Sequence, residues 1–398
     1  MFRKILFWLH LVTGLAVGLV VGVMSFTGAA LAFERDLVAW TESDARLVTP
    51  PAGNPARLTL DQLVGRVRAM HPEGAIASIT VSAGPTDAVA IALPRNVTLY
   101  ANPYTGELRE PPVTRLRTFL RTMIAWHVRL NAKPGPDNLG ATIASACTVA
   151  AVFLGLSGLV LWWPRAATSR VLRPSLWFVR GATGRARDWN WHNVVGFWTL
   201  PCFLIMTVSG VVLSYRWANN LVFRIAGETP PSQTAPARPV TPAVAARPAP
   251  ILGLDAVFAV VQQQTTTAWD QISFRFAPAL PLSPNAGGDR SASSTYTVTI
   301  RDKNPWPVFV KTTLTLDSRT GEVRRRETPA DMSPGTRARS WLRLLHTGEA
   351  FRWPGQIVAG VACLGACLLV WTGFALAWRR FFSRNSSAAA TPAEGNAP

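Results

Sequence analysis

The residues of this sequence with the clearest chemistry are its five histidines. Four of them form two pairs whose members take corresponding places in the two halves of the chain. The pairs are His10 with His192 and His127 with His346, and the fifth histidine is His71. Two imidazoles that face each other from neighbouring helices can bind opposite sides of one metal ion, as the axial ligands of a b-type haem do. The pairing therefore predicts two haem sites.

The members of each pair are expected at equal depth. His10 follows Lys4 by six residues and His192 follows Arg187 by five, which places both ~7–9 Å inside the basic ends of their helices. The second pair lies in amphipathic segments, because the apolar residues around each histidine recur at helical spacing. These residues are Leu116, Leu120, Met123 and Leu130 for His127, and Trp341, Leu342 and Leu345 for His346.

Two other interpretations of the histidines remain open. In the first, a histidine in a membrane helix only hydrogen-bonds a neighbouring helix. His71, which lies in a Pro- and Gly-containing segment outside the pairs, is typical of a solvated turn. The second interpretation is a zinc site. A zinc site would need cysteines or carboxylates beside the histidines. The four cysteines lie elsewhere, in apolar runs where they are typical of helix packing. They are Cys147, Cys202, Cys363 and Cys367.

The elements that must carry these histidines are four apolar stretches, each long enough to cross a ~30 Å hydrocarbon layer. They run from about 5 to 33, 139 to 163, 193 to 217 and 356 to 378. Basic residues lie before the first, between the second and third and after the fourth, so the positive-inside rule places both termini in the cytoplasm. The first stretch, at ~25 residues, is too long for the core of a signal peptide, and we expect it to be retained.

The composition agrees with a multi-pass membrane protein. The 398 residues are 48% hydrophobic and only 16% charged, which excludes a disordered chain. The net charge of +18 would suggest nucleic acid as the partner of a soluble protein. Here the basic residues flank apolar runs, so lipid headgroups and topology account for them, and we expect no nucleic acid partner.

The chain also contains an internal repeat. His10 is followed by Gly14 and Thr27-Gly28, and His192 by Gly196 and Ser209-Gly210, at the same offsets. Each half continues with a short amphipathic helix, at 58–70 or 254–264, three alternating strands and a Thr-Gly-Glu turn. We therefore expect a parallel duplication in which each half contributes a helix out, a small α+β domain and a helix back.

The expected architecture is a mainly α membrane protein with four transmembrane helices and two periplasmic α+β domains. Its parts are helix 1 at 1–33, the first α+β domain at 34–112, an amphipathic helix and helix 2 at 113–163, a basic cytoplasmic loop at 164–190, helix 3 at 191–217, a Pro-rich linker (within 227–250) and the second α+β domain at 218–335, an amphipathic helix and helix 4 at 336–380, and a disordered cytoplasmic tail at 381–398.

Three segments of the chain resemble the PepSY-associated transmembrane family of iron-regulated inner-membrane proteins. They are Phe7-Trp8-Leu9-His10 with Thr27-Gly28 and Glu34, Asp188-Trp189-Asn190-Trp191-His192-Asn193 with Gly196 and Ser209-Gly210, and Trp341-Leu342-Arg343-Leu344-Leu345-His346. The Thr-Gly-Glu turns resemble the end of a PepSY domain. The resemblance implies two periplasmic PepSY-like domains, bound b-type haem and, in some members, reduction of Fe(III) in a siderophore.

The sequence thus predicts an inner-membrane protein that passes electrons through two haems, with His10, His192, His127 and His346 as the iron ligands. The donor is a cytoplasmic or quinone reductant, and a ferric siderophore is the expected periplasmic acceptor, which would make the protein a ferric-siderophore reductase. The alternative is a non-enzymatic module in which the PepSY-like domains bind a periplasmic protease or another envelope partner. No catalytic residue can be named.

Overall fold

The computed structural model describes residues 1–382 apart from 54, 73, 95–96, 112–113, 136, 165–167, 232–251, 266–267 and 282–294. The chain divides into two compact units, which are treated separately. The bundle unit contains Met1–Glu34, Leu116–Glu228 and Ala338–Pro398, and the sheet unit contains Arg35–Arg115 and Thr229–Arg337. Most of the predicted Pro-rich linker and nearly all of the predicted C-terminal tail lie outside the described residues.

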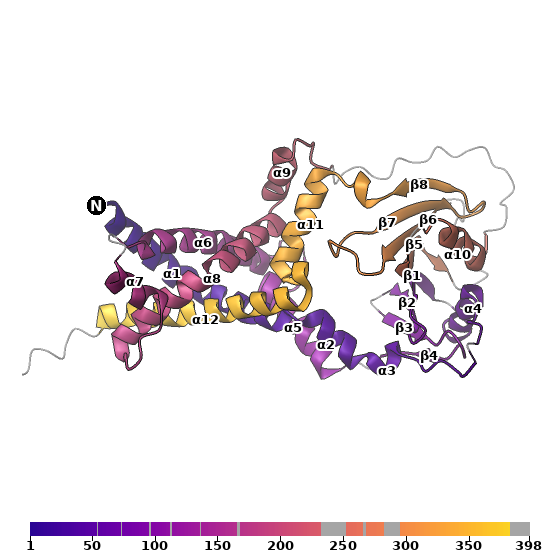
Figure 1. The fold of residues 1–398 in the computed structure, drawn as a ribbon, viewed down its shortest axis with the longest axis horizontal. Coiled ribbons are helices and arrows are strands. Elements are labelled where there is room, and N and C mark those ends of the chain that lie inside the picture. The colour runs from indigo at the N-terminus through magenta and orange to yellow at the C-terminus, as the bar shows by residue number, and fades with distance from the viewer. Residues whose placement is uncertain are drawn as a thin grey trace, which may run out of the picture. The chain divides into compact units, whose positions relative to one another are not determined.

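Four long helices form the core of the bundle unit (Figure 1). They are α1 (Phe2–Leu31), α6 (Leu139–Trp162), α8 (Gly184–Ser214) and α12 (Arg352–Phe382). Within the described residues these four are long and apolar enough to cross a membrane, so the structure has a candidate membrane-spanning helix at each predicted span. α1 and α8 each pack against both α6 and α12. α1 and α8 therefore lie diagonally across the bundle, as do α6 and α12.

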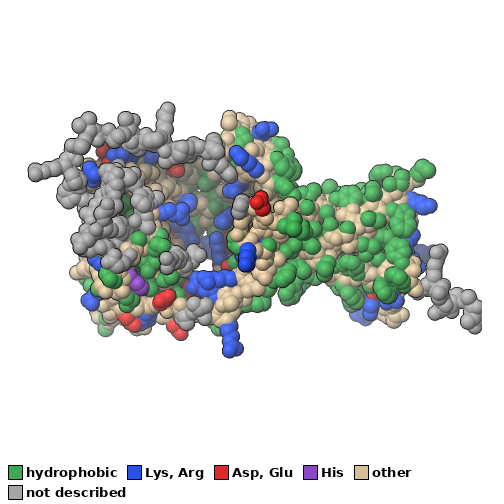
Figure 2. Space-filling model, turned by 180° about the vertical axis from the view of Figure 1, so that it is seen from behind, with side chains coloured by type: hydrophobic (Ala, Val, Ile, Leu, Met, Phe, Trp, Pro, Cys, Tyr) green, Lys and Arg blue, Asp and Glu red, His purple; other side chains and the backbone are tan. Residues whose placement is uncertain are grey.

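The outer surface of the four helices is apolar and their contacts are made by small residues. Figure 2 shows hydrophobic side chains spread over these helices, and Leu19, Val361 and Trp378 are each more than half exposed. The buried positions include Ala144, Ala151, Ala359, Gly360 and the two cysteines Cys147 and Cys363. Because lipid is as apolar as a helix surface, membrane helices associate mainly through close packing of such small residues.

The shorter helices of the bundle unit flank these spans. α5 (Arg115–Arg129) and α11 (Pro334–Thr347) carry His127 and His346, as their amphipathic pattern predicts, while α7 (Ser169–Leu176) and α9 (Arg216–Ile225) flank α8. α8 itself begins at Gly184 rather than near 193 as expected. Hydropathy marks only the part of a helix that lies in lipid, so the polar first turns of α8 escaped the prediction.

The sheet unit contains one eight-stranded antiparallel sheet built from both halves of the chain (Figure 1). The first half supplies α2 (Glu34–Thr41), α3 (Ser43–Arg46), α4 (Leu60–Met70), β1 (Ala75–Ser82), β2 (Val89–Leu93), β3 (Val97–Ala101) and β4 (Leu108–Arg109). The second half supplies α10 (Leu254–Gln263), β5 (Trp269–Pro281), β6 (Thr295–Asp302), β7 (Thr312–Asp317) and β8 (Val323–Glu327). The strand order is β4-β3-β2-β1-β5-β6-β7-β8.

The two α+β segments were expected as separate domains, and the structure joins them in this one sheet. The junction is the antiparallel pairing of β1 with β5, the corresponding first strands of the two halves, in which Thr80 faces Ser273. The hydroxyl oxygens of these two residues lie 2.9 Å apart. Each half alone would expose its first strand as a sheet edge, and pairing the two edges satisfies both sets of backbone groups.

One face of the sheet is covered by α4 and α10, as Figure 1 shows. The inward residues of the strands alternate with polar ones, as in Ile79, Phe274 and Val298, and they form one continuous core with the apolar stripes of the two helices. The predicted Thr-Gly-Glu turns also match, because Asn102 and Asp317 each accept two backbone N–H bonds at the equivalent turn. The two halves thus repeat one local structure.

Two aspartates cap each other's helices where α4 and α10 begin. The carboxylate of Asp255 accepts from the backbone N–H groups of Leu60 and Asp61, and the carboxylate of Asp61 accepts from those of Leu254 and Asp255. Burial, a side-chain hydrogen bond to Asp255 and the charge of that residue raise the pKa of Asp61 above its usual 3.8. Asp61 therefore holds a proton more tightly in the folded protein than in the unfolded chain.

This pair predicts a pH-dependent contribution to stability. Because the folded pKa of Asp61 is raised, the folded protein binds more protons than the unfolded chain just above pH ~4, so this contribution is present below that pH and is lost as the pH rises through the raised pKa. The neighbouring Tyr296 has a pKa raised to about 12 and does not titrate in this range. The asparagine side chain of Asp61→Asn does not titrate, so this variant lacks the pH-dependent contribution of residue 61.

We therefore expect the wild-type chain to gain thermal stability relative to Asp61→Asn as the pH is lowered from about 7 to about 4, measured by circular dichroism of the full chain in detergent. The comparison cancels the groups that titrate equally in both proteins. A difference in midpoint that does not change with pH would contradict the raised pKa of Asp61.

Candidate functional site

The histidines of the second pair face each other in the bundle unit. The ring centroids of His127 on α5 and His346 on α11 lie 6.2 Å apart, with an angle of 64° between the ring planes. Two imidazoles on opposite sides of one metal ion, with metal–nitrogen bonds of about 2 Å, hold their centroids about 6 Å apart. The separation therefore leaves room for a metal ion between the two rings.

Each of the four paired histidines is held through Nδ1 by a hydroxyl group from a neighbouring membrane helix. The Nδ1 to oxygen distances lie between 2.8 and 3.2 Å. For the second pair a backbone carbonyl, that of Met24 or Met206, also lies within 2.9 Å of Nδ1. The hydroxyl partners are Ser157 for His10, Thr372 for His192, Thr27 for His127 and Ser209 for His346.

The direction of these hydrogen bonds fixes the tautomer of the rings. Each hydroxyl donates its own hydrogen to the carbonyl four residues earlier in its helix, at 2.6 to 2.8 Å. Its oxygen is then an acceptor for the ring, so the proton of the neutral imidazole lies on Nδ1 and the lone pair lies on Nε2. Within the described residues Nε2 has no hydrogen-bond partner in any of the four rings. Metal-bound histidines are oriented in this way, by a hydrogen bond from the other ring nitrogen.

A glycine directly follows each hydroxyl residue and the ring packs against it, and at Gly28 and Gly210 the contact is tighter than an added Cβ ordinarily makes. A Cβ atom added at Gly28 or Gly210 would come within 3.3 Å of Cε1 of His127 or His346. The corresponding distances to His10 from Gly158 and to His192 from Gly373 are 3.4 and 3.7 Å. One dipeptide, Ser-Gly or Thr-Gly, thus supports one histidine in each of the four spans.

The environment keeps the second pair uncharged. Burial and, to a smaller extent, the charge that His346 would carry lower the pKa of His127 to about 4, against the opposing effect of the bond to Met24. Burial likewise lowers the pKa of His346. Both rings are therefore neutral near pH 7, which is the form that binds a metal ion.

The first pair lies about 25 Å from the second along the bundle, because His10 and Thr27 are 17 residues apart on α1. His10 and His192 line one cavity of about 510 Å³ between the four long helices. The cavity is mostly apolar, and glycines such as Gly14, Gly18 and Gly196 provide its width. Ligand cavities in proteins measure about 300–1,000 Å³, so this one has room for a cofactor-sized molecule.

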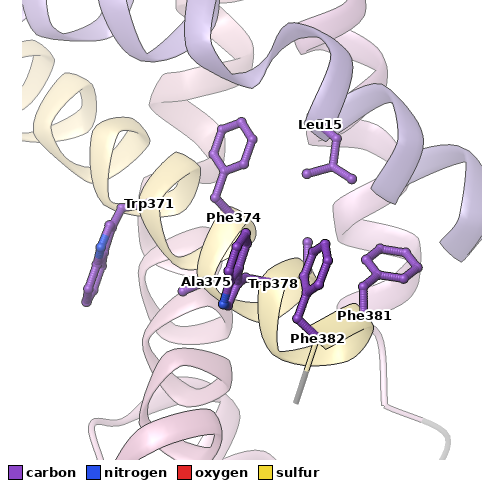
Figure 3. A pocket seen from close by; sticks show the side chains of 8 residues that line it. Leu15, Trp371, Phe374, Ala375, Trp378, Phe381 and Phe382 are labelled. Carbon is purple, nitrogen blue, oxygen red and sulfur yellow. The ribbon is translucent and has the colours of Figure 1, made fainter. Parts of the chain in front are cut away.

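A second, smaller pocket lies on the outer side of this cavity. Figure 3 shows Leu15 of α1 and Phe374 of α12 beside the aromatic side chains that line it. Leu15 and Phe374 line both hollows, and the ring of Phe374 lies over Gly18, where an added Cβ would come within 3.0 Å of it. These two side chains therefore form the wall between the central cavity and the outer surface of the bundle.

A buried carboxylate ties α8 to α12 at the same end of the bundle. The side chain of Asp188 is fully buried, and it accepts bonds from Arg187 at 2.8 and 3.0 Å and from Arg379 at 3.0 Å. Arg187 also lies over the rings of Trp191 and Trp371, 5.6 and 5.4 Å from their centroids. This cluster fixes the helix ends on either side of the cavity.

The structure thus brings His127 and His346 together and places His10 and His192 on one cavity. The fifth histidine, His71, ends α4 in the sheet unit and is half-buried rather than solvated. Thr27-Gly28 and Ser209-Gly210 were predicted only to mark the internal repeat, and no Ser-Gly or Thr-Gly dipeptide was assigned to a histidine. Their recurrence, once in each span, was the available signal. Within the described residues no group of three or more His, Cys, Asp or Glu side chains is placed to bind a metal.

Comparison with known proteins identifies the family of the chain. A search of curated proteins found no match. The family model described as the PepSY-associated TM region matches residues 7–380, which includes all four paired histidines and both units. The chain therefore belongs to the PepSY-associated transmembrane family.

Proposed function

We propose that this chain is a dihaem b-type protein of a bacterial inner membrane that passes electrons across the bilayer. The observation that carries the proposal is the common setting of the four histidines, each with Nδ1 held by a hydroxyl and Nε2 without a partner. A haem bound by two histidines changes between Fe(II) and Fe(III) without exchanging ligands, which is electron-transfer chemistry.

The residues of this chain fit that group. His127 and His346 have the separation expected for two ligands of one iron, and His10 and His192 share a cavity large enough for a porphyrin. The hydroxyl partners hold the Nδ1 proton and raise the basicity of Nε2. The apolar walls of the cavity exclude water, and the levels of the two pairs are separated by most of a ~30 Å hydrocarbon layer.

The proposed orientation of the chain in the membrane follows from the positions of its basic residues. Basic residues cluster where α1 begins, before α8 and where α12 ends, so the His10 end is assigned to the cytoplasm and both PepSY-like segments to the periplasm. Electrons then enter near His10 from a cytoplasmic or quinone donor and leave near His127. The proposed acceptor is a ferric siderophore, because Fe(II) binds hard oxygen ligands far less tightly than Fe(III), and one electron per iron releases the metal.

The test is the visible spectrum of the full chain purified in detergent. We expect Soret and α bands that sharpen with dithionite and a haem content of two per chain by pyridine haemochrome assay. Mixed anaerobically with a ferric hydroxamate siderophore, the reduced protein should reoxidise and release Fe(II) to ferrozine, whereas the Ga(III) complex, which cannot be reduced, should leave it reduced. Absence of haem would overturn the proposal in favour of a PepSY-like module that binds an envelope protein.

A further inference from the structure

Two arginines at the mouth of the His10 cavity differ from the other arginines around them. Arg185 and Arg380 both line the cavity, and within the described residues neither has an ion pair or a hydrogen bond. Their neighbours Arg187 and Arg379 are both bound to Asp188, and Arg3 donates to three carbonyls at the end of α6. Two cations at the mouth are thus left for a ligand.

Arg185 shares a helix face with His192 on α8, and Arg380 shares one with Gly373 on α12. Arg185, Trp189, His192 and Gly196 are spaced 4, 3 and 4 on α8, and all four line the cavity. On α12, Gly373 supports His192 and Arg380 follows it by seven residues on the same face. The Cα atom of each arginine therefore lies about 10 Å along its helix from the level of His192, toward the same end of the bundle.

Arg380 is also fixed in place. Its guanidinium lies over the rings of Phe7 and Trp8, 4.9 and 5.0 Å from their centroids. Stacking on aromatic faces orients an arginine without neutralising it. The site thus combines an apolar, glycine-widened interior with two oriented cations at one end.

We propose that Arg185 and Arg380 bind the two propionate carboxylates of a porphyrin whose apolar ring fills the cavity between His10 and His192. The assignment rests on the proposed function. Guanidinium groups match carboxylate oxygens in geometry as well as charge, and the apolar interior with both cations at one end fits a molecule with an apolar body and its anionic groups together. An anionic lipid headgroup has the same chemistry and is the competing occupant.

The test uses iron-free protoporphyrin IX and its dimethyl ester, because neither needs Nε2 of a histidine. Full-length protein from haem-deficient cells, in neutral detergent, is titrated with each and followed by porphyrin fluorescence. We expect wild type to bind the free acid about 10- to 100-fold more tightly than the ester. Both arginines are exposed, so water screens the two contacts, and this ratio corresponds to about 0.7–1.4 kcal/mol for each. In Arg185→Gln/Arg380→Gln this preference should fall to within about twofold, while binding of the ester stays unchanged.

The control is Arg180→Gln, which removes an exposed cation from the same end that does not line the cavity, and it should keep the wild-type preference. Persistence of the preference in the double variant would overturn the assignment. So would equal binding of acid and ester by wild type together with loss of co-purified phosphatidylglycerol in the double variant, which would assign the arginines to lipid. If the arginine-dependent preference appears but no histidine-dependent haem spectrum does, the proposed function fails and this inference stands.

Discussion

Alanine at His10 or His192 is expected to remove one of two haems from the purified protein and to leave the other. The two rings line one cavity, and each offers a single ligand nitrogen, so loss of either leaves one iron with a single protein ligand. His127→Ala or His346→Ala should remove the other haem. The measurement is the haem content per chain, together with low-temperature α-band spectra that distinguish the two sites.

Substitution of the hydroxyl residues tests the same sites with a smaller expected effect on haem binding. Ser157→Ala or Thr372→Val removes the acceptor of the Nδ1 proton without removing a ligand. Removing the hydrogen-bond partner of a metal-binding histidine typically lowers metal affinity by about 10- to 100-fold, so these variants should lose haem on dilution or show a shifted midpoint potential. His71→Ala is the control and should match wild type. If the α-band spectra show that His10→Ala and His192→Ala lose different haems, the ligands are paired wrongly.

Replacing Asp188 with alanine should strongly destabilise the bundle unit. The carboxylate is fully buried between Arg187 of α8 and Arg379 of α12, and its removal leaves two guanidinium groups without their counter-charge. Breaking one partner of a fully buried ion pair costs about 3–5 kcal/mol. Because Arg187 and Arg379 are 36% and 40% exposed, water screens their charges, and we expect a smaller loss of about 1–3 kcal/mol. We expect a lower thermal midpoint in detergent and weaker haem retention near His10, because the helix ends around the cavity lose their tie.

The matched control for that variant is Glu107→Ala. Glu107 also pairs with an arginine, Arg109, at 2.8 Å, but its side chain is 55% exposed, and surface ion pairs contribute less than about 1 kcal/mol. Both proteins are melted under the same conditions and followed by far-ultraviolet circular dichroism. If Asp188→Ala lowers the midpoint no more than Glu107→Ala, the buried cluster does not hold α8 to α12.

The sequence alone determined the local elements of this protein. Apolar runs of sufficient length identified α1, α6, α8 and α12, because crossing a membrane demands a continuous apolar helix. Alternation of apolar and polar residues predicted three strands in each half, and the structure adds a fourth, β4 or β8, after each Thr-Gly-Glu turn. The equal depth of His10 and His192 could be predicted because both spans repeat one pattern of offsets. The family resemblance rested on the same residues.

Only the tertiary structure decided which of these elements meet. The hydroxyl partner of His10 is Ser157, 147 positions away, and that of His192 is Thr372, 180 positions away. The joining of the two α+β segments through β1 and β5, the mutual capping of Asp61 and Asp255, and the placement of Arg185 and Arg380 on one cavity are equally long-range. Periodicity shows which face of a helix or strand is apolar, but the partner of that face depends on the packing of the whole chain, which no local pattern encodes.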